Sequence, residues 1–219
     1  MDIDALKRAI ERQAVLVAEL QHRVRNIMAM INALAWRTRD SATSVDDYAE
    51  RLSGRLMSLA RTQALLTRSA NAGVCLRGML EEEISSQAHD STQYSLASAD
   101  VLLPPKAAEV LSLAVHELGT NALKHGALAA REGRIEVRWV VEAREGQRWL
   151  DLHWCERRPV PEAWAPPSRR GLGLALIEQR VPYELQGTGV LAFSAEGVDA
   201  HIRFPLRERD NLLQTDAPA

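Results

Sequence analysis

The stretch VHELGTNALKHGAL, residues 115–128, decides how the rest of this sequence is interpreted. At 3.6 residues per helical turn, Glu117, Asn121 and Lys124 share one face of a predicted helix. An amide oxygen can coordinate a hard cation, a carboxylate can act as a base or hold a metal-bound water, and an ammonium group can contact phosphate. This set suits a magnesium-bound phosphate chain. A solvated polar face is the plainer interpretation of the same pattern.

The segments around this helix alternate between helix and strand patterns. Helical spacing or helix-starting signals occur at 79–88, from 104 to 128 and at 171–185. Strand patterns occur at 135–141 and 148–156, and a closing hairpin is predicted at 189–206. The sequence therefore predicts an α+β domain with helices on one face of a mostly antiparallel sheet.

Two glycines, Gly171 and Gly173, open the helix in RRGLGLALIE, residues 169–178. Glycine permits close backbone approach, and a helix N-terminus attracts phosphate. Structural turn glycines are the commoner case. The proline- and arginine-rich loop before them, residues 157–170, is long enough to act as a lid.

The tripeptide WCE, residues 154–156, ends the second predicted strand. Glu156 can accept a hydrogen bond from an exocyclic amine such as that of adenine. Trp154 is more simply a core residue. The tripeptide alone does not choose between these roles.

The N-terminal segment, residues 2–38, has no proline or glycine, and its apolar residues recur at helical spacing. After a polar break, Ser44 is a plausible N-cap, and a second amphipathic helix follows. Two such helices predict an antiparallel hairpin with an uncovered apolar face. Pairing of two hairpins into a four-helix bundle would cover that face, so we expect a homodimer.

His22, in the stretch ELQHRVRN, lies roughly opposite Leu20 and therefore off the apolar stripe of the first helix. An ordinary solvent-facing histidine is the simple alternative. Arg23 and Arg25 add positive charge nearby, and Asn26 lies one turn further on. An imidazole is a good nucleophile near neutral pH, and arginines hold anionic phosphoryl groups.

The composition excludes several classes. With 27 basic and 29 acidic residues, the net charge of −2 gives no bulk reason to expect nucleic-acid binding. The two cysteines have no metal-type spacing and predict a reduced, cytoplasmic protein. No apolar run reaches the roughly 20 residues that cross a bilayer, and the N-terminus lacks an apolar signal core.

Taken in order, these pieces resemble the HWE-type histidine kinases of bacterial two-component systems. ELQHRVRNIMAMINALA is similar to the family's phosphoacceptor box, and RLSGRLMSLARTQALL to its second dimerisation helix. VHELGTNALKHGAL is similar to its nucleotide-binding N box, and WCE supplies the tryptophan and glutamate of the family name. RRGLGLALIE and GVDAHIRFPL are similar to the glycine-rich box and the final strand.

The resemblance implies a dimeric histidine-phosphotransfer hairpin over residues 1–70, a GHKL-type ATP-binding α/β sandwich over 71–209 and a flexible tail over 210–219. It implies ATP and Mg²⁺ as cofactors. His22 would be the phosphorylated residue and Glu117 the base, or the residue that orders a metal-bound water.

The resemblance also assigns the nucleotide site. Asn121 would coordinate Mg²⁺, and His116, Lys124 and His125 would contact the nucleotide. Glu156 would replace the adenine-reading aspartate of ordinary histidine kinases. The residues that would border the phosphates are Gly171 and Gly173.

The sequence departs from the family pattern at three points. One is that the last box carries GVDAH in place of a Gly-Thr pair. Arg157 and Arg158 stand where glycines usually follow the WxE motif, which puts the geometry of the adenine-side loop in question. The phosphoacceptor box begins at Glu19, so little chain precedes it. We expect the input to come from a separate sensor protein, which the initial Met favours, or the chain to be a fragment of a longer one.

The resemblance implies an ATP-dependent autokinase that phosphorylates His22 and passes the phosphoryl group to an aspartate of a response-regulator receiver domain. One alternative is a histidine phosphotransferase with a degenerate domain that binds no ATP. A pure relay does not need the residues of the nucleotide site, so their presence argues against it: Glu117, Asn121, Lys124, Gly171 and Gly173. Another is a GHKL serine kinase acting on an anti-sigma partner, which would not need His22.

Overall fold

The computed structural model describes residues 3–68, 73–97, 99–144, 146–160 and 175–207. The chain divides into two compact units, Met1–Leu56 and Met57–Ala219. The second helix contributes residues to both units.

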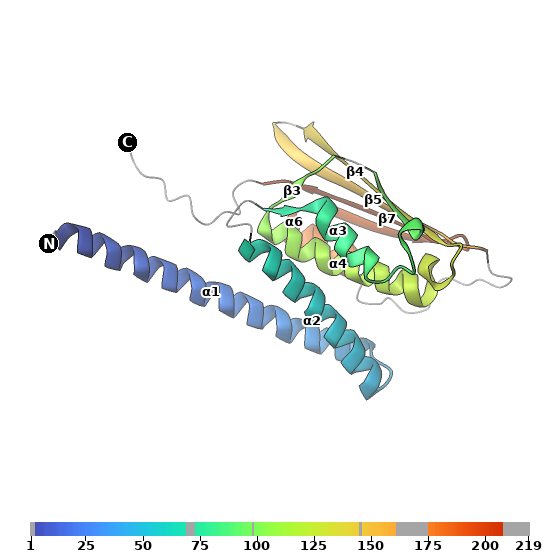
Figure 1. Cartoon of the computed structure of the whole chain (residues 1–219), viewed down its shortest axis with the longest axis horizontal. Helices are drawn as coiled ribbons and strands as arrows, with labels where there is room; N and C mark the ends of the chain where they lie inside the picture. Colours follow the sequence, from blue (N-terminus) through green and yellow to red (C-terminus); the bar gives the residue numbers. More distant parts are fainter. Residues whose placement is uncertain (1–2, 69–72, 98, 145, 161–174, 208–219) are drawn as a thin grey trace. The chain divides into compact units, whose positions relative to one another are not determined.

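Two long helices, α1 (Ile3–Ser41) and α2 (Val45–Arg68), are joined by a short turn; both are visible in Figure 1. The predicted N-cap of α2 is confirmed, because the backbone N–H of Asp47 donates to Oγ of Ser44 at 3.1 Å. The Asp47 carboxylate in turn accepts hydrogen bonds from Arg51 Nε at 2.6 Å and from Thr43 N at 2.9 Å. These bonds, with the Arg51 bond the larger, lower the pKa of Asp47 to about 2.

A buried polar contact ties the two helices together near their turn. Nη1 of Arg55 donates to Oγ1 of Thr38 at 2.6 Å, and that hydroxyl donates to the carbonyl of Leu34 at 2.6 Å. Arg55 is 3% exposed and Thr38 is fully buried. A buried guanidinium needs such acceptors, because without them its desolvation would oppose folding.

The second unit is built on a five-stranded sheet with the strand order β2-β4-β5-β7-β6. Only β2 and β4 run parallel, and the other neighbours are antiparallel, as the sequence predicted. The strands are β2 (Tyr94–Ala97), β4 (Arg134–Arg144), β5 (Gln147–Arg157), β6 (Thr188–Phe193) and β7 (Val198–Pro205).

Helices cover one face of this sheet (Figure 1). They are α3 (Leu76–Ser85), α4 (Pro105–His125) and α6 (Val181–Leu185), which follows a π-helical turn at Leu176–Arg180. The inward side chains of the central strands include Trp154 and Phe204, which are fully buried. Burial of each such side chain contributes about 1.5–3 kcal/mol. Among the helices within the described residues, none is long and apolar enough to span a bilayer.

The structure adds elements that the sequence patterns did not reveal. A two-residue strand β1 (Val74–Cys75) pairs with β3 (Leu102–Leu103). The sequence patterns predicted neither of these strands, nor β2. Short 3-10 turns occur at Ser91–Gln93 and Ala127–Ala129. The helix predicted at 79–88 begins earlier, at Leu76, and ends at Ser85. Strands of two to four residues are too short to establish an alternating pattern.

Several predicted features lie outside the described residues. Most of the predicted lid, together with Gly171 and Gly173, falls in 161–174, and the predicted tail falls beyond 207. These predictions stay as stated.

Candidate functional site

The predicted N-box helix forms α4, which starts at Pro105 and ends at His125. Pro105 at the start fits the helix because its missing N–H is one of those left unpaired there. Glu117 is buried, with 8% of its surface exposed, whereas Asn121 and Lys124 are exposed. Along one side of α4, the side chains therefore change over two helical turns from a buried carboxylate to an exposed amide and an exposed ammonium group.

Glu156 lies at the end of β5, beside the chain that leaves α4, and it is 1% exposed. Both oxygens are occupied. Nε1 of Trp154 donates to Oε1 at 3.0 Å, and the backbone N–H of Ala127 donates to Oε2 at 3.2 Å. Residues two apart on a strand share a face, so the Trp-x-Glu spacing brings the indole beside the carboxyl group.

The environment of Glu156 changes its ionisation. Burial raises the pKa of this carboxyl group, and the hydrogen bonds from Trp154 and Ala127 offset only part of the rise, so the pKa lies at about 7. Near neutral pH the group is therefore present in both protonation states. A neutral carboxyl group can donate as well as accept a hydrogen bond.

The two arginines after Glu156 brace the same end of the sheet. Arg157 forms an ion pair with Asp199 on β7 at 3.1 Å, and it also donates to the Glu156 carbonyl at 2.8 Å. Arg158 donates to the carbonyl of His125 at the end of α4 and to that of Ala195 at 3.3 Å. The arginines thus link strand β5, strand β7 and the end of α4.

His116 has a contact that the sequence analysis missed. Its Nδ1 lies 2.5 Å from Oε1 of Glu83 on α3. The Glu83 carboxylate also accepts a hydrogen bond from the guanidinium of Arg61. Glu83 is 33 residues from His116, and no local spacing signals this pair. The predicted contact of His116 with a nucleotide stays a prediction.

His22 lies within α1, but its side chain is outside the part of the structure that can be described. Lys124 and His125 are exposed at the end of α4.

Among the described residues, no group of three His, Cys, Asp or Glu side chains lies close enough together to hold a metal ion. Mg²⁺ usually takes one or two protein oxygens and completes its shell with phosphate and water. The oxygens of Glu117 and Asn121 fit that chemistry.

Two family models match the chain in succession. The model described as HWE histidine kinase matches residues 19–100, and the model described as histidine kinase-like ATPase domain matches residues 86–182. The first match includes His22, and the second includes α4 and Glu156.

Relatives and solved structures agree with these matches. A blue-light-activated histidine kinase of Brucella anthropi is 28% identical over 99% of this chain and 45% of its own length. The corresponding protein of Brucella ovis is 27% identical over 94% of this chain and 42% of its own length. The chain thus spans about half the length of these relatives.

The same architecture occurs in a solved histidine kinase domain. The domain comes from the blue-light activated histidine kinase of Erythrobacter litoralis EL346, and it superposes with a TM-score of 0.61 at 22% identity. The superposition covers 88% of this chain and 92% of the solved domain, and at this identity it supports the fold alone. Over residues 19–182 the chain therefore matches an HWE histidine kinase model followed by a histidine kinase-like ATPase domain, in the order in which the motifs occur.

Proposed function

We propose that this chain binds Mg-ATP on its second unit, transfers the γ-phosphoryl group to His22, and passes it to an aspartate of a response-regulator receiver domain. The match to both halves of a histidine kinase within one chain supports the proposal. The named activity of the Brucella relatives points in the same direction.

The composition of α4 is the observation that carries the proposal. This helix presents exposed Asn121 and Lys124 on the same side as the buried Glu117. An amide oxygen can coordinate a hard cation, a carboxylate can act as a base or hold a metal-bound water, and an ammonium group can contact phosphate. A nucleotide site uses all three groups.

In the proposed reaction, each group has a separate task. When bound, Mg²⁺ would neutralise phosphate charge, with Asn121 as its protein ligand. Lys124 and His125 contact phosphate oxygens as donors. Glu117 accepts the proton of His22 or orders a water molecule. Phosphoryl transfer depends mainly on positioning and charge neutralisation, so the loss of any one of these groups affects the rate strongly.

The direct test is incubation with γ-labelled ATP and magnesium. We compare the wild type with His22→Ala and Asn121→Ala, and Ser53→Ala on the exposed side of α2 serves as the matched control. Acid-labile label on the wild type and the control, absent from the other two, supports the autokinase. Addition of a receiver domain then removes the label from the wild type.

Two other outcomes correspond to the two alternatives. If ATP gives no label but a phosphorylated receiver domain still labels His22, the protein is a relay. Acid-stable label on an added protein indicates a serine kinase. Glu117, Asn121 and Lys124 on one side of α4 argue against the relay, because a pure relay does not need them.

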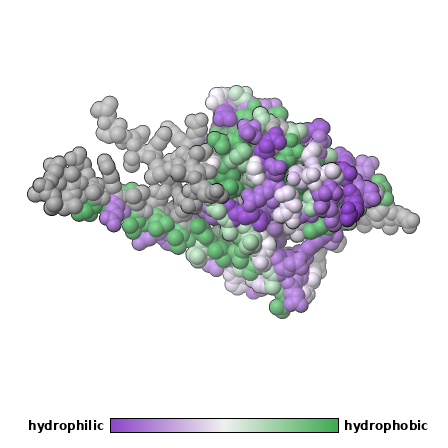
Figure 2. Space-filling model, viewed as in Figure 1, coloured by the Kyte–Doolittle hydropathy of each residue, from purple (hydrophilic) through white to green (hydrophobic). Residues whose placement is uncertain are grey.

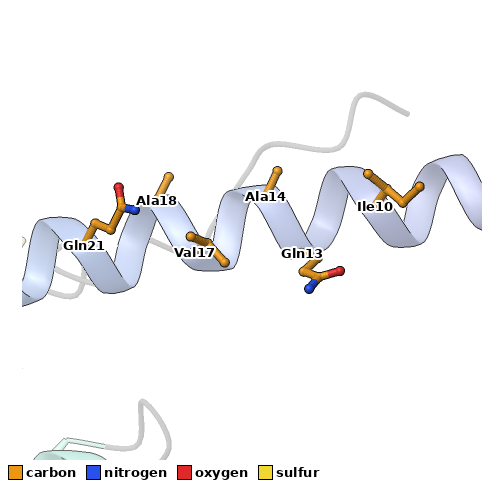
Figure 3. A pocket seen from close by; sticks show the side chains of 6 residues that line it. All are labelled: Ile10, Gln13, Ala14, Val17, Ala18 and Gln21. Atoms are coloured by element: carbon orange, nitrogen blue, oxygen red, sulfur yellow. The ribbon is translucent and has the colours of Figure 1, made fainter.

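We also propose a homodimer formed through α1. Large apolar side chains along this helix are exposed: Ile10, Val15, Val17, Leu20, Val24 and Met28. Hydrophobic atoms accordingly follow the described part of the helix in Figure 2. Figure 3 shows that a shallow hollow in this region is lined by residues of α1 alone, among them Ile10, Ala14 and Val17. A second copy of the hairpin would fill it and remove apolar surface from water.

A separate sensor or input protein and a cytoplasmic location stay predictions. The blue-light response named for the relatives is a property of those longer proteins. Pull-down with a candidate sensor protein, with Val45→Glu as a surface control, would test for the input partner.

A further inference from the structure

A buried charge network centred on Glu83 joins three helices of the second unit. Arg61, on the end of α2, donates through Nη2 to both carboxylate oxygens of Glu83, at 2.9 and 2.7 Å. Nδ1 of His116 on α4 lies 2.5 Å from Oε1, and Oγ of Ser58 lies 3.3 Å from Oε2. Every member lies within residues 57–219.

The network is buried at its centre. The Glu83 side chain is 5% exposed, that of His116 is 13% exposed and that of Arg61 is 28% exposed. Burial raises the pKa of Glu83, but the hydrogen bonds from His116 and Arg61 outweigh it, so the pKa lies below its ordinary value. Glu83 is therefore ionised. Because an ionised carboxylate has no hydrogen to give, His116 donates through Nδ1.

This geometry gives His116 a different task from the one its place in the N box implies. We propose that His116 is a positioning residue, which holds the α4 helix to residues 57–68 of α2 through the carboxylate of Glu83. Glu117 is the next residue along α4, so the network fixes the rotation of the turn that carries the proposed base. A second contact, from Gln63 to Glu109 at 2.7 Å, joins the same two helices.

The expected effect on catalysis rests on the proposed kinase function. The contact of α2 with α4 through Glu83 does not depend on that function. The helix α2 has residues in both units, and phosphoryl transfer requires His22 of the first unit to meet ATP on the second. A residue that anchors the end of α2 to α4 can then alter the transfer step without touching the nucleotide. Loss of the network should lower the rate at saturating ATP and leave nucleotide affinity unchanged.

The test uses Glu83→Gln, His116→Gln and Arg61→Met in the full chain, with Glu142→Gln as the matched control. Glu142 is also a glutamate paired to an arginine, but it is exposed at the end of β4. Hydrogen exchange without nucleotide should become about tenfold faster or more in residues 57–68 of each network variant. Binding of a fluorescent ATP analogue should stay within about twofold of the wild type, and labelling at saturating ATP should fall about tenfold.

The double variant Arg61→Met/His116→Gln provides a further check. Arg61 and His116 both act through Glu83. Hydrogen exchange of residues 57–68 in the double variant should therefore be little faster than in either single variant. Circular dichroism identifies any variant that has failed to fold, and the partly exposed Arg61→Met is the least at risk.

Two results would overturn the inference. One is unchanged exchange in residues 57–68 of a folded network variant. The other is a His116→Gln variant that weakens nucleotide binding as strongly as Asn121→Ala, since that assigns His116 to the nucleotide site. If the wild type takes no label from ATP, the proposed function fails, and the exchange measurement still decides the link.

Discussion

The indole Nε1 of Trp154 donates a 3.0 Å hydrogen bond to Oε1 of Glu156, two residues further along β5. Both side chains face the helices, and both are almost completely buried. The indole stabilises the ionised carboxylate, yet burial dominates and keeps the pKa of Glu156 at about 7. The tryptophan and the glutamate of the WxE motif therefore form one polar unit inside the core.

The first prediction concerns stability as a function of pH. The pKa of Glu156 is raised from 4.5 to about 7 on folding, so the unfolded chain ionises first as pH rises. The contribution of this group is fully present below about pH 4.5 and is lost as the pH rises to about 7. The loss amounts to about 3 kcal/mol of unfolding free energy. Urea unfolding at pH 5, 6 and 7.5 measures it.

Other groups titrate in the same range, so the comparison with Glu156→Gln isolates this one. The variant has no ionisable group at position 156, and its stability should change less between pH 5 and 7.5 than that of the wild type. Parallel pH profiles for the two proteins would contradict the prediction.

The second prediction concerns Gly126, which follows α4. A Cβ atom at this position would lie 2.2 Å from Oε2 of Glu156 and 2.8 Å from Cα of Ala122. Gly126→Ala must therefore displace the Glu156 carboxyl group, and we expect a loss of about 1–3 kcal/mol. Gly78→Ala is the control, since a Cβ there meets nothing within 4 Å. In the helix α3 it should stabilise by about 0.5–1 kcal/mol. Thermal melts compare the two, and equal effects would contradict the prediction.

The third prediction tests the start of α2. Ser44→Ala removes the acceptor for the Asp47 N–H and should cost about 0.5–2 kcal/mol. Ser53→Ala, an exposed serine in the same helix, should change stability little. Hydrogen exchange of the first turn of α2 provides the local readout. Equal protection in the two variants would show that the serine cap is dispensable.

The fourth prediction tests the proposed dimer. Leu20 is 61% exposed on α1, so Leu20→Glu should leave the protomer folded while it places a charge in the proposed interface. We expect the solution mass to fall from dimer to monomer at micromolar concentration, as measured by light scattering. Val45→Glu, at an 82% exposed position on α2, should remain dimeric. A monomeric wild type would contradict the proposed assembly.

The features that sequence patterns could predict are local. The helix at 105–125 and the serine cap at Ser44 depend on spacing within a few residues, and both are present in the structure. The long strands β4 and β5 follow the alternation of their residues, because one face is buried and the other is not. Family resemblance then supplied the order of these elements.

One contact that could not be predicted joins residues far apart in the chain. Nothing near His116 indicates that its partner is Glu83, because a helix pair brings them together only after folding. For Trp154, the expected position in the core is confirmed. Its hydrogen bond to Glu156 was not expected, because side-chain direction at the sheet surface was needed to see it.

The position of Arg61 affects how this protein can be divided. An ATP-binding fragment that begins after the hairpin, at Gly73, would lack both Arg61 and Ser58 and keep Glu83 with His116 alone. A buried carboxylate deprived of one partner is costly, by about 3–5 kcal/mol. A fragment that begins at Met57 keeps the whole network. Both fragments contain every strand of the five-stranded sheet, but the one that begins at Met57 should be the more stable.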